Sequence, residues 1–291
     1  MYPPSSVAMF ESVTLLCMTL ALAWVRKVGS TSELVMAADS RLRFGCAWDC
    51  CPKVIAMPRS DMAMCFSGDT FHAYPLMLQV SSAIGSFSPA RSRAKDIYEV
   101  RGRVIEVFNQ MRTYIGDLPS NQKEPEIPNA SFIVGGYSWR YKRFAIWLVH
   151  FDAILKKFTF RPASAWRGGN SEKKLVVSGD YTAEFKSRLL ALLRSRTKLK
   201  SGGFDMEPFE VLRDMLRSED YPLIGGSPQL LKIQEHMNTT PYSIYWPNKA
   251  SGKRTYMGRP LLDYETSDSM AIDPDTFELY GRDSSSLVLI S

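Results

Sequence analysis

The order of the expected secondary-structure elements is the feature that most limits the fold of this chain. Apolar runs typical of strands occupy residues 19–67, and helical periodicity follows over 70–114. Strands return over 132–178, and two further helical patterns end at Arg217. Such blocks favour two sheets between helical layers over a doubly wound parallel sheet. We therefore expect an α+β protein, a four-layer αββα sandwich with two antiparallel sheets.

The individual elements follow from periodicity and from turn residues. The expected strands share apolar runs bounded by Gly, Ser, Pro or Asp, and they cover residues 19–27, 34–42, 53–57, 62–67, 132–137, 144–151, 155–160 and 175–178. The expected helices repeat apolar residues at spacings of three and four, and they cover a segment capped by Asp69 or Thr70 and residues 92–114, 182–196 and 207–217. The tail over 242–290 is rich in strand and loop signals.

Composition argues against several classes of function. The formal net charge is +6, but the basic residues are scattered among acids, as on solvated helix faces, so we expect no nucleic-acid partner. An odd number of cysteines, five, indicates a reducing compartment rather than a disulfide framework. Cys46, Cys50 and Cys51 cluster without a second ligand pair, and the chain has three histidines. We therefore expect no metal and no cofactor.

The apolar run over 13–25 raises the question of a targeting segment. At 13 residues it is too short to span a bilayer as a helix. A secretory signal is the alternative, but residues 1–12 contain no Lys or Arg, and Arg26 and Lys27 follow the run in place of a small-residue cleavage site. We interpret the run as a buried strand that begins at Thr19, and we expect a cytoplasmic protein that does not enter a membrane.

Charged residues at strand ends are the candidates for chemistry. Asp39 ends an apolar strand, and Arg41 points to the same side two residues later, so the two can form a structural ion pair. Lys53 begins the next strand and is either an edge lysine or a buried cation that tunes a nucleophile. Gly68 lies at a strand-to-helix junction, where backbone amides either point at an oxyanion or only connect two elements.

Together these residues resemble one family. A strand that opens with Thr19 is followed by Ala-Ala-Asp-Ser-Arg over 37–41, then by Lys53, and then by a strand, Ser-Gly and a helix around Gly68. This order resembles the proteasome β-subunit and the bacterial proteasome-like peptidase, which are N-terminal-nucleophile hydrolases. The resemblance continues more weakly at Phe-Ile-Val-Gly-Gly, Val-Ser-Gly and Ile-Gly-Gly, and it covers about 200 residues.

The resemblance implies a role for each matching residue. Thr19 would be the nucleophile, and its own free α-amine would serve as the base. Lys53 would hold positive charge near the Thr19 oxygen, and Asp39 would orient Lys53. The Gly68 amide would form the oxyanion hole, and Ser178 would lie beside the terminal amine. The implied reaction is cleavage of an amide bond in a peptide or a small amide through an acyl-enzyme, by a homo-oligomer.

The chain also departs from the family pattern. The interval from Thr19 to Asp39 is longer, and a longer hairpin turn over 28–33 can absorb the surplus without a change of register. The late Asp-x-x-Ser-Gly-Gly element of the family is Tyr-Pro-Leu-Ile-Gly-Gly here, with Ile224 in the serine position. The nearest acid is Asp220, one residue early, so we assign supporting roles to Asp220 and Arg41.

The resemblance divides the chain into three parts: an N-terminal extension, propeptide or wrongly assigned start over 1–18, a proteasome-like domain over 19–235, and a C-terminal extension over 236–291 packed on the same domain. Thr19 would become N-terminal by autocatalytic cleavage or by removal of an initiator Met18. An internal threonine has no free amine. If Met18 is retained, the alternative is an inactive proteasome-like scaffold or binding subunit.

Overall fold

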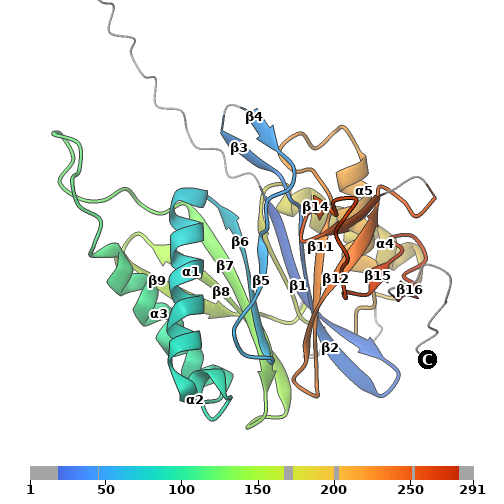
Figure 1. Ribbon diagram of the computed structural model, residues 1–291, viewed down its shortest axis with the longest axis horizontal. Coiled ribbons are helices and arrows are strands. Elements are labelled where there is room, and N and C mark those ends of the chain that lie inside the picture. The colour runs from blue at the N-terminus through green and yellow to red at the C-terminus, as the bar shows by residue number, and fades with distance from the viewer. Residues whose placement is uncertain (1–18, 45, 167–172, 200–202, 251–252, 282–291) are drawn as a thin grey trace, which may run out of the picture.

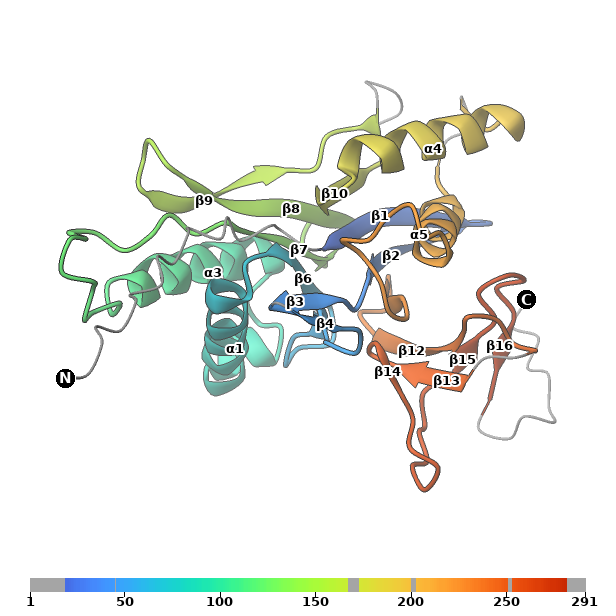
Figure 2. The ribbon, with the colours of Figure 1, turned by 90° about the horizontal axis from the view of Figure 1, so that it is seen from above.

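The computed structural model describes residues 19–44, 46–166, 173–199, 203–250 and 253–281. The N-terminal extension over 1–18 lies outside the described residues, as does the end of the tail. The described chain is a mixed α/β protein with predominantly antiparallel sheets (Figures 1 and 2). This confirms the expectation of strands and helices in blocks.

The smaller sheet is antiparallel throughout and has five strands. In spatial order they are β5 (Val54–Ala56), β6 (Met62–Gly68), β7 (Ala130–Ser138), β8 (Arg143–Asp152) and β9 (Lys157–Pro162). One hydrophobic cluster joins strands of this sheet to α1 (Thr70–Ser86) and α3 (Ile97–Arg112), and the short α2 (Ser88–Arg91) connects these helices. Figures 1 and 2 show α1 and α3 lying against this sheet.

The larger sheet has nine strands. Its main path is β10 (Leu175–Gly179), β1 (Leu20–Val28), β2 (Thr31–Ala38), β11 (Gln229–Gln234), β12 (Thr239–Trp246), β13 (Lys253–Tyr256) and β14 (Arg259–Pro260). β15 (Ala271–Ile272) pairs in parallel with β12 and antiparallel with β16 (Leu279–Tyr280). A second cluster packs strands of this sheet against α4 (Thr182–Ser195) and α5 (Glu207–Arg217).

The side chains of β1 explain how this strand is buried on both faces. Leu20, Leu22 and Trp24 belong to the cluster with α4 and α5. Ala21 and Ala23 alternate with them and belong to a third cluster, which also contains residues of the smaller sheet. Because the residues on that face are small, the two sheets approach closely. An added Cβ at Gly135 of β7 would lie 2.7 Å from Cε of Met36 in β2.

The expected helices form, with some shifts at their ends. Asp69 caps α1 as predicted, its carboxylate accepting a hydrogen bond from the Phe71 amide at 2.9 Å. α3 begins later than expected, because Asp96 and Glu99 form a capping box there. The sequence did not predict the hairpin of β3 (Leu42–Phe44) with β4 (Cys46–Trp48), the short helix α2 or the buried strand β11. Within the described residues, no helix is both long enough and apolar enough to cross a membrane.

Candidate active site

Three polar side chains meet at the end of β1 in a fully buried setting. The Lys53 ammonium donates to Thr19 Oγ1 at 2.8 Å and to Asp39 Oδ1 at 2.8 Å. Thr19, Asp39 and Lys53 are each 0% exposed. A charge that is removed from water in this way requires a partner of opposite charge, and each member of the Lys53–Asp39 pair supplies it to the other. The ammonium therefore lies directly against the threonine hydroxyl.

Backbone amides fix the carboxylate of Asp39. Oδ1 accepts the Leu20 amide at 3.0 Å, and Oδ2 accepts the amides of Arg41 at 3.1 Å and of Gly225 at 3.2 Å. These donors come from the start of β1, from the turn after β2 and from the loop before β11. Three parts of the chain that are distant in sequence thus converge on the Asp39 carboxylate and fix its position. The fixed carboxylate in turn orients the Lys53 ammonium.

Gln229 of β11 is a further part of this site that the sequence did not reveal. It is 1% exposed. Its Oε1 accepts the backbone amide of Lys53 at 2.8 Å, and its Nε2 donates to the carbonyls of Asp39 at 3.2 Å and of Cys51 at 2.8 Å. One buried amide side chain therefore ties the segment that carries the lysine to the segment that carries the aspartate. No motif indicated it, because its role depends on the pairing of β11 with β2.

The backbone nitrogen of Thr19 has an acidic partner, Asp180. The Thr19 N–H donates to Asp180 Oδ2 at 3.0 Å, and the Asp180 N–H donates to the Thr19 carbonyl at 2.7 Å. Burial is the main cause that raises the pKa of the Asp180 carboxyl above its ordinary value. The hydrogen bond from Thr19 opposes that shift. A positive charge on this nitrogen would favour the ionised carboxylate.

Ser178 and Gly68 lie at two similar strand-to-helix junctions, Ser67-Gly68-Asp69 at the end of β6 and Ser178-Gly179-Asp180 at the end of β10. The Oγ atoms of Ser67 and Ser178 are 2.6 Å apart, so the junctions contact each other beside Thr19. Both glycines have positive φ, +105° at Gly68 and +108° at Gly179. An added Cβ at Gly179 would lie 1.9 Å from the Thr19 carbonyl oxygen, so only glycine fits there.

The two supporting residues expected from the sequence have other contacts. The Arg41 guanidinium pairs with Asp49, with Nε–Oδ1 at 2.7 Å and Nη2–Oδ2 at 2.8 Å, and it also donates to the Pro222 carbonyl. Hydrogen bonding in this pair raises the pKa of Arg41 and lowers that of Asp49. Asp220 is exposed, and its carboxylate accepts a hydrogen bond from the Ser218 hydroxyl at 2.8 Å. Thus Lys53 is the buried cation paired with Asp39, and Asp180 is the acid at the Thr19 nitrogen.

Comparison with known proteins shows which fold this chain shares. A scan against protein-family models and a search of curated proteins found no match. Among solved structures, the chain is similar to the Gly-1 mutant of Anbu from Hyphomicrobium sp. strain MC1, with a TM-score of 0.52 and 14% sequence identity. The similarity covers 76% of this chain and 84% of that one. Anbu is a bacterial proteasome-like protein of the N-terminal-nucleophile hydrolase type, so the chain has a proteasome-like fold.

Proposed function

We propose that this protein is a threonine-type N-terminal-nucleophile hydrolase, a peptidase or amidohydrolase that cleaves amide bonds through an acyl-enzyme. The observation that carries the proposal is the placement of the Lys53 ammonium 2.8 Å from Thr19 Oγ1 and 2.8 Å from Asp39 Oδ1, with all three residues buried. A hydroxyl is a weak nucleophile unless a nearby group takes its proton, and positive charge beside the oxygen favours the ionised form.

The proposed reaction requires Thr19 to be the first residue of the mature chain. Its α-amine, with an ordinary pKa near 8, then takes the proton from Oγ1 as the oxygen attacks the substrate carbonyl carbon. Lys53 stabilises the developing alkoxide, and the Gly68 amide donates to the carbonyl oxygen in the tetrahedral intermediate. The amine passes its proton to the leaving nitrogen, and the C–N bond breaks to leave an ester on Thr19. Water then hydrolyses the ester.

Asp180 takes the supporting role that the sequence suggested for Asp220. The carboxylate lies 3.0 Å from the Thr19 nitrogen, so it holds that nitrogen in place and balances its charge when it is protonated. Ser178, two residues before Asp180 in the same junction, orders the neighbouring Ser67-Gly68 segment through its hydroxyl contact of 2.6 Å with Ser67. Gln229 acts as a positioning residue through the backbone of both Lys53 and Asp39.

The proposal includes the architecture that the resemblance implies. The three hydrophobic clusters support an αββα order, since they lie between α1/α3 and the smaller sheet, between the two sheets, and between the larger sheet and α4/α5. We assign residues 19–235 to the proteasome-like domain. Residues 236–291 form an extension whose β12 pairs with β11 of that domain. The substrate would be a peptide or small amide, and the active form a cytoplasmic homo-oligomer.

A catalytically inactive scaffold is the second candidate. The observation that favours it is the Thr19 nitrogen, which donates to Asp180 Oδ2 at 3.0 Å in a chain that carries residues before Thr19. In that form the Thr19 nitrogen is a peptide amide, which is not a base. The enzyme and the scaffold therefore differ in one covalent bond, the peptide bond between Met18 and Thr19.

The experiment that tests the proposal compares three purified proteins on a panel of fluorogenic peptide amides, with intact mass spectrometry of each. They are the parent chain, Thr19→Ala, and the control Thr31→Ala at the exposed β1–β2 turn. We expect the mature parent and Thr31→Ala to begin at Thr19 and to turn over substrate, and Thr19→Ala to show none. Equal turnover by Thr19→Ala would exclude Thr19 as the nucleophile.

A further inference from the structure

The C-terminal extension reaches the candidate active site through one hairpin. β13 and β14 of the extension are joined by a turn that contains Gly258, which has a φ of +92°. An added Cβ at Gly258 would overlap Oγ of Ser40 and would lie 3.1 Å from Nε2 of Gln229. Ser40 follows Asp39 in the chain, and Gln229 holds the backbone amide of Lys53. The tip of the hairpin therefore lies against both segments that carry the buried ion pair.

A chain of hydrogen bonds also runs from this hairpin to the same segments. The Thr255 hydroxyl of β13 donates to the Ile244 carbonyl of β12 at 2.9 Å, and its oxygen lies 2.6 Å from Oγ of Ser227. The Ser227 carbonyl accepts a hydrogen bond from the Ser40 hydroxyl. The oxygen of that hydroxyl accepts a hydrogen bond from Gln229 Nε2 at 3.0 Å. All of these residues are buried, so the chain is shielded from water.

Burial makes the position of each member of this chain specific. A buried hydroxyl that loses its partner is not compensated by water, so a satisfied network holds the elements that it joins in one arrangement. Without Thr255 Oγ1, the Ser227 hydroxyl keeps the Pro228 carbonyl at 3.1 Å as an acceptor, which belongs to its own loop. The contact between Thr255 and Ser227 is therefore the step that connects the extension to the loop before β11.

Gln229 connects this chain to the ion pair. Its Oε1 accepts the backbone amides of Lys53 at 2.8 Å and of Val54 at 3.1 Å. Its Nε2 donates to the Asp39 carbonyl at 3.2 Å. Because the side-chain amide is planar, a shift of Ser40 at Nε2 also redirects Oε1. A displacement of the hairpin would therefore reach the backbone of both Lys53 and Asp39.

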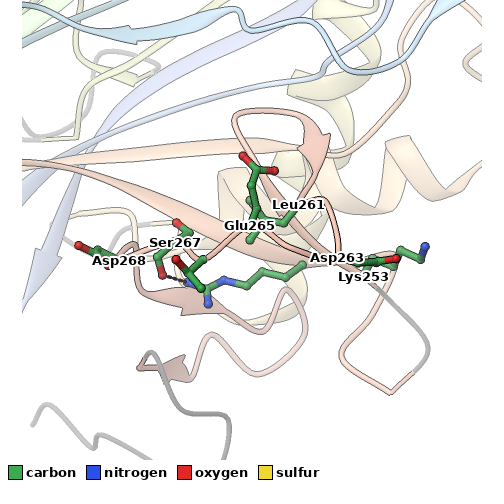
Figure 3. Close-up of a pocket in the computed structure, with 8 residues that line it drawn as sticks. Lys253, Leu261, Asp263, Glu265, Ser267 and Asp268 are labelled. Atoms are coloured by element: carbon green, nitrogen blue, oxygen red, sulfur yellow. Dashed lines mark hydrogen bonds between the residues drawn. The ribbon is translucent and has the colours of Figure 1, made fainter.

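The other side of the hairpin is also held in place. It borders a cavity of about 650 Å³, which is lined by Lys253, Leu261 and acidic and hydroxyl residues of the loop over 263–268 (Figure 3). Arg254 of β13 donates to the carbonyls of Ser267 and Ser269, in and just after that loop. The hairpin thus extends from the outer loop of the extension to the segments of the ion pair.

We propose that the C-terminal extension positions the Lys53–Asp39 pair, with Thr255 and Ser227 as positioning residues that act through Gln229. The extension is then part of the catalytic machinery and not an addition that only increases stability. Its effect on turnover rests on the proposed hydrolase function. The positional link can be measured without turnover, from the exchange of the backbone amides around the ion pair.

Thr255→Val tests the link, because valine keeps the branched shape of threonine and removes only the hydroxyl. Thr255→Ser is the conservative variant that keeps the hydroxyl. Thr239→Val is the matched control, since the Thr239 hydroxyl of β12 donates to the Ser60 carbonyl at 2.8 Å in the same extension. Hydrogen–deuterium exchange of the full-length proteins, read by mass spectrometry, compares the amides over 39–54 with those of α3 over 97–112.

We expect exchange over 39–54 to be about fivefold faster in Thr255→Val, as for the loss of one net hydrogen bond, and unchanged over 97–112. Thr255→Ser and Thr239→Val should exchange like the parent over both ranges. Unchanged exchange over 39–54 in Thr255→Val would overturn the proposal. An equal increase over 97–112 would also overturn it, because the hydroxyl would then only stabilise the whole fold.

Turnover of the fluorogenic amides gives the second measurement. Thr255→Val should lower kcat by about tenfold or more with KM within about twofold, because small displacements of catalytic groups slow the chemical step. Thr255→Ser should restore the parent kcat. Unchanged kcat in Thr255→Val, with an active parent, would overturn the positioning role. Faster exchange over 39–54 together with an inactive parent would support the link and refute only the hydrolase proposal.

Ser227→Ala breaks the same contact from the other side, and it decides the question if Thr255→Val does not fold. The double variant Thr255→Val/Ser227→Ala should exchange no faster over 39–54 than the faster single variant, because the two hydroxyls act through one contact. Additive increases would contradict the assignment of one shared contact.

Discussion

The buried Lys53–Asp39 pair gives an asymmetry in stability that can be measured. Substitution Asp39→Ala leaves the Lys53 ammonium buried without its carboxylate, and it also removes the acceptor of the Leu20, Arg41 and Gly225 amides. Breaking a buried ion pair from one side costs about 3–5 kcal/mol. The amides that lose their acceptor add to that cost. We therefore expect the destabilisation by Asp39→Ala to lie at or above the upper end of this range.

The reverse substitution, Lys53→Met, should cost less. It keeps an unbranched side chain of similar size, and the Asp39 carboxylate retains its three backbone donors. The loss is then close to that of one hydrogen bond to a charged group, about 1.5–3 kcal/mol. The surface ion pair of Arg41 with Asp49 supplies the control. Asp49→Ala breaks this pair, which is worth about 0–1 kcal/mol.

Urea unfolding of the parent and variants, followed by tryptophan fluorescence and circular dichroism, measures these differences in the free energy of unfolding. The double variant Asp39→Ala/Lys53→Met should be less destabilised than the sum of the single variants, by about 1–3 kcal/mol, since it leaves no unpaired charge. If Lys53→Met destabilises more than Asp39→Ala, the backbone amides do not hold the carboxylate as described. Additive effects would mean that the two charges do not stabilise each other.

Three further predictions follow from single contacts. The raised pKa of Asp180 means that its carboxyl stabilises the fold when protonated, and that this contribution is lost as the pH rises from about 4 through the raised value. Asp180→Asn in the unprocessed chain should therefore be more stable than the parent at neutral pH, with the difference vanishing in acid, and pH-dependent melting curves check this. Gly179→Ala should destabilise strongly, because its Cβ would meet the Thr19 carbonyl at 1.9 Å, whereas Gly102→Ala on an open face of α3 should stabilise by about 0.5–1 kcal/mol in the same assay. Burial raises the pKa of the Cys65 thiol, so iodoacetamide should modify exposed Cys46 in the native protein and reach Cys65 only after unfolding, as read by peptide mass mapping.

The sequence predicted well where local signals are strong. Asp69 followed by an apolar periodicity predicted the start of α1, and the length of the expected helix over 207–217 agrees with α5. The assignment of Asp39 and Lys53 to one site came from the family resemblance rather than from a local signal, and the two side chains do meet in the structure. The two helix predictions depend on residues close in the chain, for which periodicity and capping are informative.

The sequence did not predict what depends on distant pairing. β11 has a short apolar run, and it becomes a central strand only through its register with β2 and β12. Gln229 gained its role from that register. The signal for Asp180 was present, since Ser-Gly-Asp occurs at both 67–69 and 178–180, after a strand and before a helix each time. Only the structure shows that the two triplets touch through Ser67 and Ser178.

We propose the α-amine of Thr19 as the catalytic base, so a change in the position of that amine should abolish turnover. Two proteins would be prepared from a cleavable leader, one that begins at Thr19 and one that carries a single additional glycine before it. Turnover of the fluorogenic amides and the mass of any acyl adduct from a peptide β-lactone are then compared. We expect turnover and an adduct on Thr19 only for the protein that begins at Thr19. Equal turnover by the glycine-extended protein would contradict this proposal.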